Sequence, residues 1–136
     1  MSDITEKELE SINQLARSVH GLAREKGWYD GQPLPGQLSE AEESAFVERT
    51  CNNMHDEVSE LHEAWRNGVL HGLCDKERAM KDAGIYPLTC IEEELADIVI
   101  RALDSAAFLG VDIGSAIKRK HQFNATRAHR HGGKKS

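Results

Sequence analysis

Two pairs of carboxylates, each spaced three residues apart, are the residues of this sequence with the clearest chemical potential. Glu57 and Glu60 form the first pair, in EVSEL, and Glu94 and Asp97 form the second, in ELAD. Residues three apart on a helix share a face, with Cβ atoms roughly 5–6 Å apart, so each pair could share one cation. Two such helices packed face to face would gather four carboxylates, whose mutual repulsion a bound divalent cation relieves. The sequence therefore predicts a metal site with these four residues as ligands.

The chemistry of the predicted ligands indicates which metal the site would take. Ligands that are all oxygen atoms favour Mg²⁺ or Mn²⁺. The Glu-x-x-His motif of ferritin-like di-iron centres is absent, and the histidines and Cys74 match no zinc-binding spacing. A single Glu-x-x-Glu pair is more often a solvated helix face, so the argument depends on there being two pairs.

A basic segment near the C-terminus could bind phosphate. Its Lys120, Asn124 and Arg127 side chains could converge on phosphate oxygens, with arginine making two parallel hydrogen bonds. Trp28 and Tyr29 could stack on a nucleobase, with Trp28 as the substrate-binding candidate, or they could instead close one end of the bundle. On its own the basic segment is ordinary surface chemistry, but beside a cation held by four carboxylates it would complete a polyphosphate site.

The elements that must position these side chains are helices. Apolar residues recur at helical spacing, a capping box starts at Ser39, and no alternating strand pattern occurs. We expect an all-α bundle with helices over 5–26, 40–67, 91–109 and 113–124, and an irregular connection over 73–90 with one helical turn near 76–82.

The carboxylate pairs lie beside apolar stripes of two of these helices. Met54, Val58, Leu61 and Trp65 form one stripe, and the other is formed by Ile91, Leu95, Ile98, Ala102 and Ala106. We expect both stripes to face the core, with the carboxylates at its edge. Arg101 and Asp104 continue the charged ridge of the second helix, and we expect them to orient the metal ligands.

Length, charge and cysteine content limit the class of protein. A chain of 136 residues is the size of one domain, so we expect a single domain over 1–127 and a basic, flexible tail over 128–136. The net charge of −6 is uneven, because residues 118–136 hold seven basic and no acidic residues. Three scattered cysteines and the absence of a signal-peptide or membrane-helix pattern predict a cytoplasmic protein without disulfides.

These motifs resemble the MazG-like, all-α nucleoside triphosphate pyrophosphohydrolase superfamily. The similarity lies in EKGWYD at 25–30, EVSELHEAWRNG at 57–68, EEELADIVIRALD at 92–104 and KHQFNATRAHRHGGK at 120–134. The order of the motifs carries the resemblance: Glu-x-x-Glu, a spacer, Glu-x-x-Asp, and then a K-x-x-x-N-x-x-R element. The spacer segment at 74–85 is longer and more polar than the resemblance predicts.

The resemblance implies a four-to-five-helix bundle, assembled as a homodimer or homotetramer, that hydrolyses a (deoxy)nucleoside triphosphate to the monophosphate and pyrophosphate. It implies that Glu57, Glu60, Glu94 and Asp97 bind Mg²⁺, or Mn²⁺ in its place, with about two or three ions per site. It also implies that Lys120, Asn124 and Arg127 bind phosphate. Our hypothesis for the proton acceptor is Glu60.

The expected role is control or cleaning of the nucleotide pool, with no membrane and no specific nucleic acid as partner. The alternative is a non-catalytic helical module that binds a nucleotide or a partner protein.

Overall fold

The computed structural model describes residues 2–127, and helices dominate this part of the chain. Its helices are α1 (Glu6–Glu25), α2 (Glu40–Arg66), α3 (Glu77–Asp82), α4 (Cys90–Leu109) and α5 (Ile113–Thr126). Residues 2–127 contain no strand, only an isolated bridge between Leu73 and Thr89. The predicted all-α fold is confirmed, and the predicted ends of the long helices agree with the structure to within 2 residues. The predicted basic tail, 128–136, lies outside the described residues.

Three of the helices begin at capping boxes. At the start of α2 the Ser39 hydroxyl accepts a hydrogen bond from the Glu42 N–H, and the Glu42 carboxylate accepts one from the Ser39 N–H. Thr5 and Thr89 do the same at the starts of α1 and α4. These bonds satisfy N–H groups that have no partner within a helix. The α4 capping box therefore fixes the helix just before its carboxylate motif.

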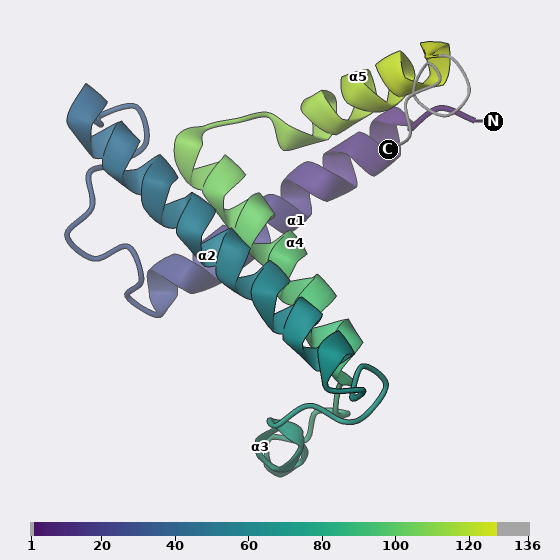
Figure 1. The fold of residues 1–136 in the computed structure, drawn as a ribbon. Coiled ribbons are helices and arrows are strands. Elements are labelled where there is room, and N and C mark those ends of the chain that lie inside the picture. The colour runs from purple at the N-terminus through teal and green to yellow at the C-terminus, as the bar shows by residue number, and fades with distance from the viewer. Residues whose placement is uncertain (1, 128–136) are drawn as a thin grey trace.

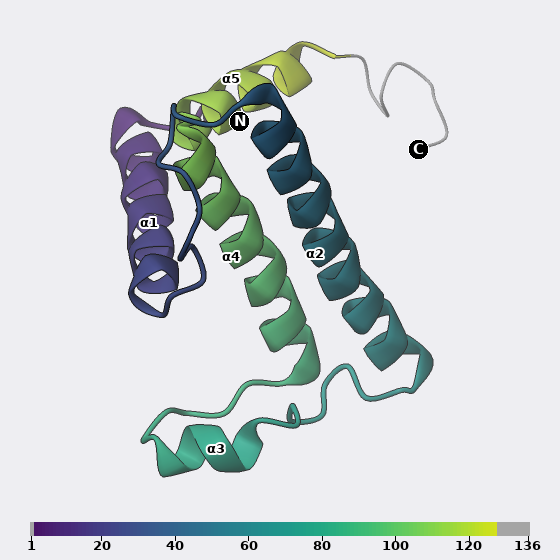
Figure 2. The same cartoon turned by 90° about the vertical axis from the view of Figure 1, so that its left-hand side faces the viewer.

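Helix α4 lies between α1 and α2, as Figure 2 shows, with α5 packed on α1 and on the end of α4, and α3 beyond the opposite end of α2 and α4. An aromatic cluster joins the three long helices. Phe108 of α4 is fully buried, and its ring centroid lies 4.3 Å from that of Phe46 on α2 and 4.8 Å from that of Tyr29. Tyr29 belongs to the connection that follows α1, where Gly27 adopts a positive φ of 82° that favours glycine. The cluster therefore fixes this connection against α2 and α4.

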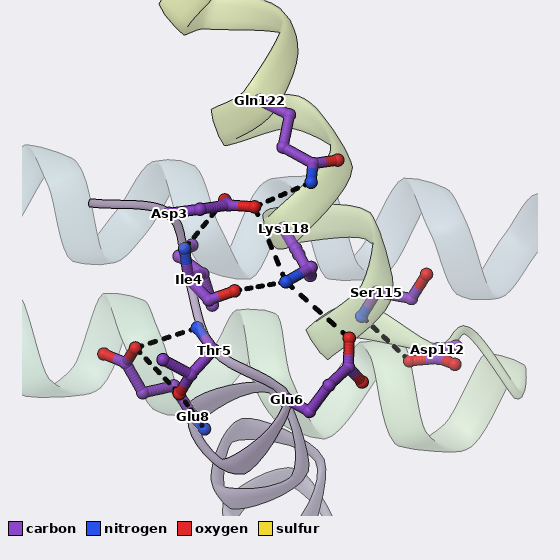
Figure 3. Close-up of polar contacts among 9 residues, drawn as sticks. All are labelled: Asp3, Ile4, Thr5, Glu6, Glu8, Asp112, Ser115, Lys118 and Gln122. Carbon is purple, nitrogen blue, oxygen red and sulfur yellow. Dashed lines mark hydrogen bonds and ion pairs between the residues drawn. The ribbon is translucent and has the colours of Figure 1, made fainter. Parts of the chain in front are cut away.

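Polar contacts tie α5 to the N-terminal segment and α1 (Figure 3). Lys118 Nζ lies 3.6 Å from both Asp3 Oδ2 and Glu6 Oε1. The same ammonium donates to the Ile4 carbonyl, and Gln122 donates to the Asp3 carboxylate over 2.7 Å. These contacts hold α5 along the N-terminal half of α1, which Figure 1 also shows.

The start of α5 makes a close contact with α1. The Gly114 N–H donates to Asn13 Oδ1 over 2.8 Å. A Cβ atom at Gly114 would lie 2.5 Å from the Leu9 carbonyl oxygen, so glycine is needed for this approach. The orientation of α5 is therefore set by its contact with α1 and not by α2.

The prediction that both apolar stripes face the core of the chain is wrong for much of each stripe, although Ala106 of α4 is buried and Ile98 is half-buried. Val58 and Trp65 of α2 are 51% and 62% exposed, and Leu95 of α4 is 48% exposed. The buried residues of α2 are instead Phe46 and Glu57. The reason is that α2 packs only on α4 within the described chain, so its other faces have no helix to cover them. Even with these exposed apolar residues, no helix within 2–127 has the length and hydropathy needed to cross a membrane.

Candidate metal centre and adjoining pocket

Three carboxylates from two helices meet in one small volume. Glu57 of α2 and Glu94 and Asp97 of α4 each offer an oxygen atom, and these atoms all lie within 4.8 Å of one another. Glu57 and Glu94 are buried, at 6% and 8% exposure, and Asp97 is half-buried. The i,i+3 spacing puts Glu94 and Asp97 on one face of α4, and the packing of α2 on that face adds Glu57.

Glu60 lies at the solvent edge of this group. Its side chain is exposed, yet its carboxylate is close enough to Glu94 to raise the pKa of Glu94. We call Glu57, Glu60, Glu94 and Asp97 the acidic cluster. All four residues predicted as metal ligands from the sequence are therefore neighbours in the structure.

The electrostatics of the acidic cluster favour a cation. Burial, and then the carboxylates of Glu60, Glu93 and Glu57, raise the pKa of Glu94 from 4.5 to about 7. Burial and the charges of Glu57 and Glu93 likewise raise the pKa of Asp97. A nearby positive charge would reverse these effects, because it stabilises the ionised form of each carboxyl group.

One oxygen of the cluster has no hydrogen-bond partner within residues 2–127. This atom is the buried Glu94 Oε2. A buried polar atom without a partner is costly, and a metal ion is one of the groups that explain such an atom. Together with neighbouring carboxylates that supply only oxygen, this atom fits a hard divalent cation such as Mg²⁺ or Mn²⁺.

Arg101 holds one ligand of the cluster in place. Its Nε donates to Glu57 Oε1 over 2.9 Å, and its Nη2 lies 2.8 Å from the same oxygen. Because both contacts use one oxygen, Arg101 fixes the orientation of the Glu57 carboxylate and leaves its other oxygen outside this ion pair. Arg101 thus lies where the sequence argument expected an orienting residue.

Asp104 takes part in a different network. Its Oδ1 lies 2.7 Å from His20 Nδ1, and its Oδ2 accepts the Tyr29 hydroxyl over 2.8 Å. Arg24 Nε donates to His20 Nε2 over 2.8 Å, so neutral His20 carries its proton on Nδ1. Asp104 therefore orients His20 and Tyr29, whereas the two carboxylates that α4 gives to the acidic cluster, Glu94 and Asp97, come earlier in that helix.

A second basic side chain borders the cluster, and the sequence argument missed it. Lys76, in the connection between α2 and α4, places its Nζ 2.8 Å from Glu93 Oε1. Glu93 is buried, and its charge acts on both Glu94 and Asp97. The run of three glutamates at 92–94 was the available signal, since a buried member of such a run needs a cation.

A pocket of about 320 Å³ adjoins the cluster through Arg101. It lies between α2, α4 and the connection after α1, and Trp28 borders it with 67% of its surface exposed. Its lining mixes aromatic and polar side chains: Trp28, Tyr29, Phe46, Arg49, Thr50, Asn53, Arg101, Asp104 and Ser105. Tyr29 is packed in the aromatic cluster and also lines the pocket, whereas Trp28 is exposed at its border, so base stacking stays a prediction.

The basic residues of α5 lie away from the cluster in a single chain. Lys120, Asn124 and Arg127 are exposed on or just after α5, which packs on α1 and the end of α4 but not on α2. The distance along α4 from Asp97 to its last residue is about 18 Å at 1.5 Å per residue, and α5 begins beyond that end. Figure 1 shows α5 and the lower half of α2 in different parts of the molecule. The predicted phosphate-binding residues and the acidic cluster are therefore not brought together within one chain.

Comparisons with models of known protein families, with curated proteins and with solved structures found no match to this chain.

Proposed function

We propose that this chain is a metal-dependent nucleoside triphosphate pyrophosphohydrolase of the MazG-like, all-α type. The observation that carries the proposal is the buried Glu94 Oε2, which has no hydrogen-bond partner in the described part of the chain and lies inside a group of carboxylates from two helices. Such a group is unfavourable for folding unless a cation binds it, so its presence calls for a ligand. The adjoining pocket, with an exposed indole at its border, supports a flat organic group beside the cation.

The proposal assigns different roles to the residues of the acidic cluster. Glu57, Glu94 and Asp97 hold Mg²⁺ or Mn²⁺, and Arg101 keeps Glu57 oriented. When bound, the cation neutralises phosphate oxygens and favours attack of water on the α-phosphorus. Glu60, exposed at the edge of the cluster, accepts the proton of the attacking water. Trp28 stacks on the base in the pocket, and the products are the monophosphate and pyrophosphate.

The working form is a homodimer or homotetramer. Exposed apolar residues on α2 and α4, including Val58, Trp65 and Leu95, support an assembly because their burial against a second copy is favourable. The placement of α5 gives a second reason. Lys120, Asn124 and Arg127 can contribute to an acidic cluster only from a neighbouring subunit, because α5 does not reach the cluster of its own chain.

The proposed role is control or cleaning of the nucleotide pool in the cytoplasm. The test is an assay of all ribo- and deoxynucleoside triphosphates and diphosphates with Mg²⁺ and with Mn²⁺, with separation of the products. We expect monophosphate and pyrophosphate from at least one triphosphate, and loss of the reaction in EDTA. Metal binding without pyrophosphate release from any substrate would favour the alternative, a non-catalytic nucleotide-binding module.

A further inference from the structure

The connection between α2 and α4 is held firmly against the start of α4. The Cys74 N–H donates to the Leu88 carbonyl, the Cys90 N–H to Gly72 and the Ile91 N–H to Leu70, each over 2.9 Å. The Cys74 side chain is buried, at 4% exposure. The segment that carries Lys76 is therefore an ordered part of the fold, fixed beside the carboxylate motif of α4.

Lys76 reaches toward the cluster from this connection. Its Nζ lies 2.8 Å from Glu93 Oε1 and 3.0 Å from Asp75 Oδ1. An ammonium group has three donors, so these two contacts leave one for a further acceptor. Its side chain is 59% exposed, so a solute can approach it from the solvent side. Its positive charge opposes the rise in the pKa of Asp97 that burial and the neighbouring carboxylates cause, so Lys76 lies close enough to act on the cluster.

A polyphosphate held at the acidic cluster needs positive charge besides the metal. Arg101 is engaged by Glu57 through two contacts. The basic residues of α5 lie at the far end of α4 within the same chain. Of the described basic side chains, Arg101 and Lys76 border the cluster, and Lys76 keeps a donor for a phosphate oxygen while it is paired with none of the four cluster carboxylates.

We propose that Lys76 is a phosphate-binding residue of this site, contributed by the same chain that supplies the carboxylates. This inference rests on the proposed function, and it adds a residue that the motif comparison does not include. Glu93 is the positioning residue in this arrangement. Its buried carboxylate holds the ammonium at the edge of the cluster, and Lys76 in turn satisfies a carboxylate that would otherwise add to the repulsion there.

The test compares Lys76→Ala with Lys81→Ala in the full chain. Lys81 is a matched control because it is exposed on α3, in the same connection, and pairs with Glu77 at 2.6 Å and not with a group of the cluster. Calorimetry measures the binding of Mn²⁺ alone and then of inorganic pyrophosphate in saturating Mn²⁺. A lost charge-assisted hydrogen bond corresponds to a decrease of about 10- to 100-fold in affinity. We expect Lys76→Ala to show this decrease for pyrophosphate and to leave Mn²⁺ affinity within about threefold, and Lys76→Arg to recover part of it.

Four other outcomes would contradict the proposal, and each leads to a different conclusion. Pyrophosphate affinity of Lys76→Ala equal to wild type, with triphosphate hydrolysis present in the wild type, would overturn the role of Lys76 alone. An equal loss of Mn²⁺ and pyrophosphate affinity, with a lowered Tm, would assign Lys76 a structural role. Tighter Mn²⁺ binding with unchanged pyrophosphate binding would make it only a counter-ion of the empty cluster. If the wild type binds neither Mn²⁺ nor pyrophosphate, the proposed function itself fails.

Discussion

Replacing Glu94 with Gln should stabilise the metal-free protein at alkaline pH. In the folded chain the pKa of Glu94 is raised from 4.5 to about 7, chiefly by burial and then by the Glu60 carboxylate. The folded state therefore binds a proton more tightly than the unfolded state does. Stability that is present below about pH 4.5 is lost as the pH rises towards about 7, and Gln removes this loss because it does not ionise.

The expected gain in the free energy of unfolding follows from the same two pKa values. A change in the pKa of Glu94 from 4.5 to about 7 corresponds to a loss of roughly 3 kcal/mol of stability when solvent screens none of it. Solvent at the open edge of the cluster, where Glu60 is exposed, screens part of it, so we expect about 1–2 kcal/mol. For a chain of this length that is a rise in Tm of about 4–8 °C at pH 8. The gain should shrink towards zero near pH 4.5.

Thermal unfolding followed by circular dichroism in EDTA, at pH 5 and pH 8, measures this gain. Glu10→Gln, at an exposed position on α1, controls for the change in net charge. A second series in saturating Mn²⁺ should raise the Tm of the wild type and of Glu10→Gln but not of Glu94→Gln. A lower Tm for Glu94→Gln than for wild type at pH 8 without metal would refute the claim that the cluster is a site of carboxylate repulsion.

Three further predictions concern catalysis and packing. Asp97→Asn and Glu60→Gln should each remove nearly all turnover while the helical circular dichroism stays unchanged, and retained activity in either variant would refute its assigned role. Tyr29→Phe should cost about 1–2 kcal/mol in urea unfolding, because the Asp104 carboxylate loses its 2.8 Å hydrogen bond, and an unchanged midpoint would show that this bond contributes nothing. Arg127→Ala should raise KM more than it lowers kcat, whereas normal kinetics would exclude Arg127 from the site.

Much of the helical architecture could be predicted from local signals. Ser39 and Glu42 form the capping box that the sequence indicates, and Gly110, with a φ of 72°, ends α4 where the apolar spacing stops. The meeting of Glu57 with Glu94 and Asp97 was also predictable, because each pair has helical spacing and lies beside the apolar stripe of a long helix. These features depend on contacts within one helix or between two adjacent long helices.

The features that sequence reasoning missed depend on how whole elements pack. The stripe containing Val58 and Trp65 has the spacing of a core face, but spacing alone does not tell whether the covering helix belongs to the same chain. Contacts of Gly114 and Lys118 with the N-terminal part of the chain direct α5 away from the cluster, and no local pattern indicates that direction. The position of Lys76 follows from backbone pairing between Gly72 and Cys90, in a stretch that lacks helical periodicity.

The acidic cluster is the centre of the account, and anomalous diffraction from crystals grown with MnCl₂ tests it most directly. We predict anomalous difference peaks bounded by the carboxylates of Glu57, Glu94 and Asp97, the residues whose oxygen atoms lie within 4.8 Å of one another. The same crystals of Glu94→Gln should lack those peaks. Manganese found elsewhere on the protein, with none among these three carboxylates in any subunit, would contradict the account.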